Sequence, residues 1–210
     1  MMTTLTQILR SIEHDAFPPP DLGVTVVSAP SAREACVMAF TAHTVIAAEV
    51  DAAWVAERLP PEDMVAPVAP PFLTALAEAT GREAHCLDAM LLAPAQPASD
   101  LVSNLEELTD HTHPRIVRAL QYRDDVRAYV DPYGGVVIVG RGVAGRLECA
   151  IEVPDSVQGR GHGRRLAQAA RALIPADAHI WAQVTPGNAA SFRAFLAAGY
   201  RIVGSEILFF

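Results

Sequence analysis

The feature that most constrains this chain is a glycine-rich loop that joins an apolar strand to a helix within residues 147–174. Residues 147–153 are predicted as a central strand, and Gly159, Gly161 and Gly163 lead into the helix. Glycine lets the backbone approach a ligand closely and turn its N–H groups outward. Because the start of a helix also carries about half a positive charge, this junction predicts a phosphate-binding site.

Three arginines, Arg160, Arg164 and Arg165, lie in or beside the first turn of that helix. A cation is unfavourable there by roughly 0.3–1 kcal/mol unless an anion neutralises the helix end. A bound diphosphate removes this conflict. The glycines alone are equally typical of a glycine-rich turn with solvated arginines, because short glycine patterns are weak signals.

The spacing argues against two common nucleotide-binding loops. A P-loop requires GxxxxGK[ST], and all 16 basic residues of this chain are arginine, so no lysine is present. A dinucleotide-binding fingerprint requires GxGxxG almost directly after a strand. Here five residues separate Val153 from Gly159, and the glycine spacing is GxGxG. A nucleotide-dependent enzyme is therefore the least favoured interpretation.

The loop resembles the signature of the GNAT acetyltransferase superfamily, Q/R-x-x-G-x-G/A, which Gln158, Gly161 and Gly163 match. Residues 181–200 are similar to a second block of that family, a strand followed by a helix that begins at an asparagine, here Asn188, and ends at a G-[FY] pair. Two blocks in the right order are more specific than either one alone.

The resemblance covers residues 113–210 and implies both a fold and a co-substrate. The implied fold is α/β (α+β), a GNAT-like mixed and mostly antiparallel central sheet flanked by helices. Acetyl-CoA, without a metal, would lie where the parallel strands 147–153 and 180–184 splay apart. The implied contacts are the backbone of Ile151 and Val153 along the pantetheine arm, then Gln158, Gly159, Arg160, Gly161, His162, Gly163 and Arg164 at the diphosphate, and Asn188 near the thiol end.

The implied reaction moves the acetyl group directly to a primary amine of a small molecule or peptide. Glu148 and Glu152 lie four residues apart on one strand, so both point to one face. By resemblance either glutamate is a candidate general base, often acting through water; alternatively both are edge charges that face solvent. Ser191, close to the helix start, is the third catalytic candidate.

One position departs from the family pattern. A tyrosine that protonates the leaving thiolate often follows the asparagine by seven residues, and here that position is Phe195. Ser191 and Tyr200 lie nearby in sequence, but neither matches the position, so the proton donor stays unassigned. The departure keeps an alternative open, in which a catalytically weak or inactive GNAT-like domain binds acyl-CoA as a sensor or structural protein.

Composition divides the chain into two regions. Residues 1–110 carry 4 arginines against 16 acidic residues, a charge of −12, whereas residues 111–210 carry 12 arginines against 8, a charge of +4. Residues 94–112 form a polar, proline-containing connector, so we place the regions at 1–112 and 113–210. The first is an acidic α/β region, either an acceptor-side element or a degenerate GNAT-like lobe. An acidic wall there favours a cationic amine.

Other classes are disfavoured by composition and segment lengths. A hydrophobic content of 51% excludes a disordered chain. No apolar run approaches the roughly 18–20 residues that span a bilayer, and no signal peptide is evident, so we expect a cytoplasmic protein without a membrane partner. A net charge of −8 makes nucleic acid an unlikely partner, and a monomer or homodimer is expected. His111 and His113 are interpreted as a solvated loop rather than a metal site.

The hydrophobic spacing completes the prediction of secondary structure. The predicted helices are a segment within the helix-capable residues 1–20, which three prolines end, and residues 51–59, 72–80, 114–122, 163–174 and 188–198. The predicted strands are 24–27, 86–93, 126–130, 136–139, 147–153, 180–184 and 202–210, of which 126–130, 136–139 and 147–153 form an antiparallel meander. Residues 36–40 and 44–48 are interpreted as a hairpin, although their alanine content leaves a helix open.

Overall fold

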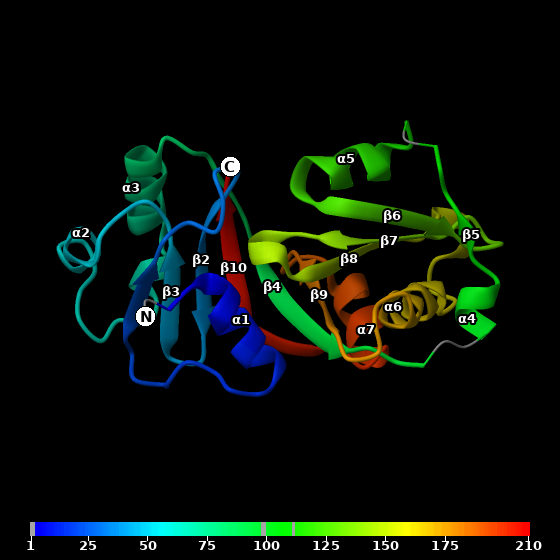
Figure 1. Ribbon diagram of the computed structural model, residues 1–210, viewed down its shortest axis with the longest axis horizontal. Helices are drawn as coiled ribbons and strands as arrows, with labels where there is room; N and C mark the ends of the chain where they lie inside the picture. Colours follow the sequence, from blue (N-terminus) through cyan, green and yellow to red (C-terminus); the bar gives the residue numbers. More distant parts are fainter. Residues whose placement is uncertain (1–2, 98–99, 111) are drawn as a thin grey trace. The chain divides into compact units, whose positions relative to one another are not determined.

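The computed structural model describes residues 3–97, 100–110 and 112–210. The chain forms two compact units, Met1–Met90 with Val203–Phe210, and Leu91–Ile202 (Figure 1). These units differ in extent from the predicted regions 1–112 and 113–210. The difference arises because the connector belongs to the second unit and the last strand returns to the first.

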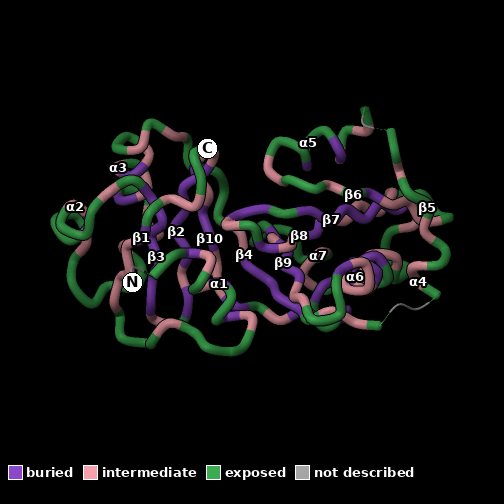
Figure 2. Tube along the Cα trace, viewed as in Figure 1, coloured by how far each residue is buried: buried purple, intermediate pink, exposed green. Residues whose placement is uncertain are grey.

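The strands of the first unit follow the order β1 (Val24–Val27), β3 (His43–Ala47), β2 (Ala35–Phe40), β10 (Arg201–Phe209) and β4 (Ala84–Pro94). β2 and β3 form the predicted antiparallel hairpin, which places Phe40 opposite His43. β1 is parallel to β3, and β10 is antiparallel to β2. β3 is buried along its whole length, as Figure 2 shows for the middle of this sheet.

The three α-helices described in the first unit overlap the predicted helical segments, although α2 ends before the predicted residue 59 and α3 starts before the predicted residue 72. α1 (Leu5–Glu13) starts at a capping box in which the Thr4 side chain accepts from the Gln7 N–H, and it buries Leu5, Leu9 and Ile12. α2 (Ala52–Ala56) is capped by Asp51. After the short 3₁₀ turn η1 (Ala66–Val68), α3 (Pro70–Thr80) starts on a proline and ends at Gly81, whose φ of 67° is the left-handed conformation that favours glycine.

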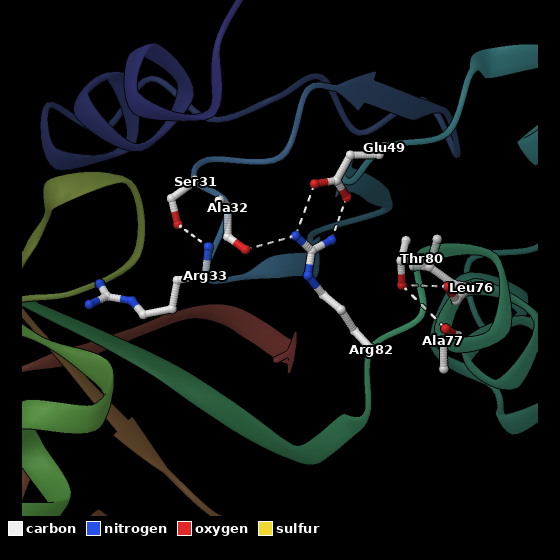
Figure 3. A network of polar contacts seen from close by, with 8 residues as sticks. All are labelled: Ser31, Ala32, Arg33, Glu49, Leu76, Ala77, Thr80 and Arg82. Atoms are coloured by element: carbon white, nitrogen blue, oxygen red, sulfur yellow. Dashed lines mark hydrogen bonds and ion pairs between the residues drawn. The ribbon is translucent and has the colours of Figure 1, made fainter.

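The first unit has its own core and its own surface network. Phe72 and Leu76 of α3 pack with Val37, Ile46 and Phe209 from the sheet. Just beyond α3, the Arg82 guanidinium binds both carboxylate oxygens of Glu49 and donates to the Ala32 carbonyl (Figure 3). The hydrogen bond from Arg82 holds the pKa of Glu49 below its ordinary value.

The second unit carries the predicted meander. Its strands follow the order β9 (His179–Val184), β8 (Leu147–Glu152), β7 (Val136–Arg141), β6 (Asp124–Val130) and β5 (Glu106–Glu107). β7 is antiparallel to both β6 and β8, and β8 is parallel to β9. The last residues of β4 lie beside β9.

Helices cover both faces of this second sheet (Figure 1). α5 (Pro114–Tyr122) packs Ile116 and Ala119 against Ala128, Val136 and Ile138. The other face carries α6 (His162–Ala172), which buries Leu166, Ala167, Ala169 and Ala170. α7 (Ala189–Ala197) packs against α6. The predicted class, a mixed and mostly antiparallel sheet flanked by helices, is confirmed.

Two local predictions need correction. The connector 94–112 contains the short helix α4 (Asp100–Ser103) and strand β5, whose Glu106 pairs with Val130 and Glu107 with Tyr129. Backbone pairing at an exposed sheet edge needs no apolar side chains, so the polar sequence concealed this strand. β7 also extends beyond its predicted end through Gly140 to Arg141 before the 3₁₀ turn η2 (Val143–Gly145). Among the described residues, no helix is long and apolar enough to cross a membrane.

Candidate functional site

β8 and β9 separate after a short paired stretch. Their parallel ladder joins Glu148 to Trp181 and Cys149 to Ala182. β8 stays paired with β7 on its other side as far as Glu152. Beyond Cys149, the edge of β8 that faces β9 therefore has no ladder partner among the described residues. An extended ligand can add to such an edge as a further strand.

The loop after β8 presents unused backbone donors. A 3₁₀ turn, η3 (Asp155–Val157), leads into the glycines, and α6 begins without a side-chain cap or an acidic residue in its first turn. The first N–H with an acceptor is that of Arg165, which donates to the Gly161 carbonyl at 3.2 Å. In the described part of the chain, the N–H groups of residues 159–164 have no acceptor. Buried or ordered N–H groups are normally paired, so this run is ready to receive an anion.

The three glycines serve two different purposes. Gly159 and Gly161 have φ values of +73° and +86°, and a Cβ added to either one meets no atom within 4 Å. The space over these two residues is thus open to a ligand. At Gly163 an added Cβ would lie 3.2 Å from the Ala194 Cβ and 3.7 Å from a Val153 methyl carbon. Gly163 therefore allows α6 to pack closely on α7 and β8.

Gln158 shapes the loop. Its side-chain amide donates to the Asp155 carboxylate at 2.7 Å and to the Val153 carbonyl at 3.3 Å. These bonds tie the loop back onto the end of β8. One of them engages the Val153 carbonyl.

The positive charge around the loop is uncompensated by acids. Arg160, Arg164 and Arg165 are exposed, and no carboxylate of the described residues lies within ion-pair distance of any of them. The His162 side chain is directed elsewhere: its ring packs on Tyr133 with centroids 4.4 Å apart, and Nδ1 lies 4.0 Å from an Asp131 oxygen. His162 can therefore serve the loop through its backbone N–H.

Glu148 lies at the point where β8 and β9 separate, and it is 3% exposed. Its Oε2 accepts from Arg123 Nε at 2.8 Å, and its Oε1 accepts from Arg146 Nε at 2.9 Å and from the Val143 N–H at 3.3 Å. Burial opposes ionisation, but the two guanidinium groups outweigh it and hold the Glu148 pKa below its ordinary value. A carboxylate bound in this way is a poor proton acceptor, so its contacts favour a positioning role.

Glu152 also pairs with an arginine, but it is far more exposed than Glu148. It is paired with Arg115 of α5, and its side chain is 43% exposed. It lies on the separated part of β8, on the same sheet face as Glu148. Of the two glutamates, Glu152 is therefore the one that water can reach.

The residues at the start of α7 and behind it are arranged around packing contacts. Asn188 caps the helix by accepting from the Ser191 N–H at 3.0 Å. Phe195 is 3% exposed and packs edge-on against Tyr200, with ring centroids 4.9 Å apart. The Tyr200 hydroxyl donates to the Ala167 carbonyl and lies 3.4 Å from Cys149 Sγ. Burial, followed by the Cys149 contact, raises the Tyr200 pKa well above its usual value.

The remaining predicted positions show no further cluster. His113 caps α5 through Nδ1, which accepts from the Arg115 N–H, and His111 lies outside the described residues. Sequence reasoning missed Arg123, Arg146 and Gln183, which surround Glu148. The sequence offered one signal for two of these residues. Arg146 directly precedes β8, and Gln183 lies in β9 directly after the last paired position.

No protein-family model matches the sequence, and no curated protein matches it. Among solved structures, the chain is similar to a protein from the GNAT family from Novosphingobium aromaticivorans, at 15% identity and a TM-score of 0.45, covering 61% of this chain and 66% of that one. It is also similar to a GCN5-related N-acetyltransferase from Kribbella flavida, at 16% identity and a TM-score of 0.42, covering 68% and 65%. The chain spans just under two thirds of either neighbour.

Proposed function

We propose that this chain is an acetyl-CoA-dependent N-acetyltransferase that transfers an acetyl group directly to a primary amine of a small molecule or peptide. One observation carries the proposal: the unpaired N–H groups of residues 159–164 directly follow the open edge of β8. A ligand with a diphosphate joined to an extended, amide-containing arm fits both features, because the diphosphate can accept from the N–H groups and the arm can pair with the strand edge.

The surrounding residues suit that co-substrate. Arg160, Arg164 and Arg165 supply positive charge, and no described carboxylate forms an ion pair with any of them. The edge of β8 beyond its ladder with β9, which includes Ile151, can pair with the amides of an extended arm that runs from the loop back toward Cys149. With this direction, the thioester end of the arm would lie where β8 and β9 separate.

Acetyl-CoA would supply an activated thioester; the amine nitrogen forms the new C–N bond, the C–S bond breaks, and the amine loses a proton. The protein must hold these groups in line and move that proton. We assign proton removal to Glu152 through water, because its carboxylate is half exposed on the open part of β8. Ser191, in the first turn of α7, is the hydroxyl that can return a proton to the thiolate through solvent.

A matched pair of variants tests the co-substrate site. Gly161 has room for a side chain, and Asp and Asn both tolerate its left-handed backbone better than other residues. We expect CoA to raise the melting temperature of the wild type and of Gly161→Asn. In Gly161→Asp, charge repulsion should abolish most of that shift. Equal shifts in Asp and Asn variants would contradict a diphosphate at this loop.

One observation favours a second candidate, an acyl-CoA-binding sensor without catalysis. The position expected to carry a proton-donating tyrosine holds the buried Phe195, and the Tyr200 hydroxyl is already bonded within the core. Release of free thiol from acetyl-CoA in the presence of an amine panel separates the two functions. A sensor binds acetyl-CoA tightly but releases thiol no faster with amines than without them.

A further inference from the structure

Arg123 lies beside the separation of β8 and β9, although it belongs to neither strand. It directly follows α5, and its side chain is 14% exposed. Nε donates to Glu148, and Nη2 donates to the Gln183 side-chain oxygen at 3.2 Å. Gln183 is the first residue of β9 beyond the last paired position, Ala182. Arg123 is therefore held at the inner end of the open edge, on the face that α5 covers.

Two arginines meet at the Glu148 carboxylate. Glu148 gives one oxygen to Arg123 and the other to Arg146. Arg146 is 5% exposed as a whole residue, and its guanidinium stacks over the Trp181 ring at 5.0 Å.

The orientation of Glu148 is fixed from a third side. A Cβ placed on Gly142 would lie 2.2 Å from the Glu148 carboxyl carbon, so this turn approaches the carboxylate as only glycine can. The Val143 N–H also donates to it. Glu148 is thus held by Arg146 and the turn without Arg123, which leaves Arg123 as the group that the cluster positions.

Arg123 keeps donor capacity. Among the residues that the structure describes, Nη1 has no hydrogen-bond acceptor, and Glu148 is the only carboxylate within ion-pair distance of the guanidinium. Guanidinium groups held by neighbours lose little freedom when they bind a carboxylate, and the resulting charge-assisted bonds are strong.

We propose that Arg123 binds the carboxylate of the acceptor, and that the acceptor is an α-amino acid whose amine receives the acetyl group. This inference rests on the proposed function, because the thioester end of the co-substrate is what brings the reaction to the separation of β8 and β9. Glu148 is a positioning residue, and Gln183 helps to fix the guanidinium plane.

Kinetics with matched acceptors tests this substrate class. Thiol release by the 210-residue chain is measured with L-amino acids and with the corresponding carboxamides, which keep the amine but lack the carboxylate. We expect kcat/KM to favour the acids, and Arg123→Gln to raise their KM by about ten- to hundred-fold while the KM for acetyl-CoA stays unchanged. Arg123→Lys should retain part of the preference. Arg118→Gln, an exposed arginine of α5, is the control.

A binding experiment keeps the test independent of turnover. Calorimetry compares N-acetyl-L-amino acids with their carboxamides on the CoA-loaded full chain. Tighter binding of the acids, lost in Arg123→Gln and kept in Arg118→Gln, supports the inference. Equal binding of acids and carboxamides, or binding of neither, overturns it. Failure of CoA itself to bind would instead refute the proposed function, so the two failures are distinguishable.

Discussion

The two ends of β8 satisfy their polar groups in opposite ways. Beyond the C-terminal end, no described residue accepts from the N–H groups of residues 159–164 or forms an ion pair with the neighbouring arginines. At the N-terminal end, the carboxylate of Glu148 is fully enclosed by Arg123, Arg146 and a backbone N–H. The C-terminal end (the open end) therefore has donors and positive charge that can bind a ligand. At the N-terminal end (the closed end), the charged groups bind one another and fix the positions of their side chains.

The two ends of β8 are therefore expected to contribute differently to ligand binding and to folding stability. A charge that solvent reaches contributes little to folding, but a buried charge whose partner is removed is strongly destabilising. Changes at the open end should therefore affect ligand affinity more than stability. Changes at the closed end should do the reverse.

Cysteine reactivity should show the largest effect. Burial raises the pKa of Cys149 to about 12, which leaves about one thiol in ten thousand ionised at pH 8. Cys149 is 2% exposed, while Cys86 is exposed. We expect iodoacetamide to modify Cys86 in the native protein and to reach Cys149 only after unfolding, as peptide mass spectrometry would show. Rapid modification of Cys149 in the native protein would contradict the burial of this part of β8.

Two isosteric substitutions on the same strand give the next largest effect. Glu148→Gln leaves Arg123 and Arg146 without their shared negative charge and should cost about 3–5 kcal/mol of unfolding free energy. Glu152→Gln removes a half-exposed pair and should cost less than about 1 kcal/mol. Urea unfolding measures both. Similar losses would erase the contrast between the two ends.

The acid limb of stability provides a second readout for the same pair. Because the Glu148 pKa is lowered on folding, its contribution is complete above the ordinary pKa of glutamate and is lost as pH falls through the lower folded value. Glu148→Gln should therefore show a shallower fall in stability toward acid than the wild type.

The smallest effect is expected at the cap of α7. Asn188→Ala removes the acceptor of the Ser191 N–H and should cost about 1 kcal/mol. Ser191→Ala keeps that cap and should leave the unfolding free energy nearly unchanged, since alanine is the better helix former. A loss at Ser191 that matches the loss at Asn188 would indicate that the hydroxyl has a structural partner.

The sequence predicted the open end of β8 far better than the closed end. The loop glycines, the helix start and the meander β6–β7–β8 are set by neighbouring residues, and local pattern was enough to find them. The setting of Glu148 depends on Arg123, 25 residues away, and on Gln183, which lies 60 residues from Arg123. Two carboxylates four residues apart on one strand looked equivalent until those distant partners were placed.

Residue spacing also could not reveal which strand completes which unit. β5 is formed by two glutamates whose backbone alone pairs, and its polar sequence carries no strand signal. β10 was predicted as a strand, but its pairing with β2 joins Ser205 to Ala39 and Phe209 to Ala35, far apart in the chain. Hydrophobic alternation predicts a strand without naming its neighbour.

The return of β10 sets an order of assembly during synthesis. The first unit takes up Val203–Phe210 only after all of Leu91–Ile202 has been made. Until then β2 has an unpaired edge, and the core lacks Ile207 and Phe209. An open, apolar strand edge invites pairing with other chains. The nascent first unit therefore stays incomplete until β10 has been synthesised. During that time, the net charge of −12 over residues 1–110 opposes association between neighbouring copies, because like charges repel.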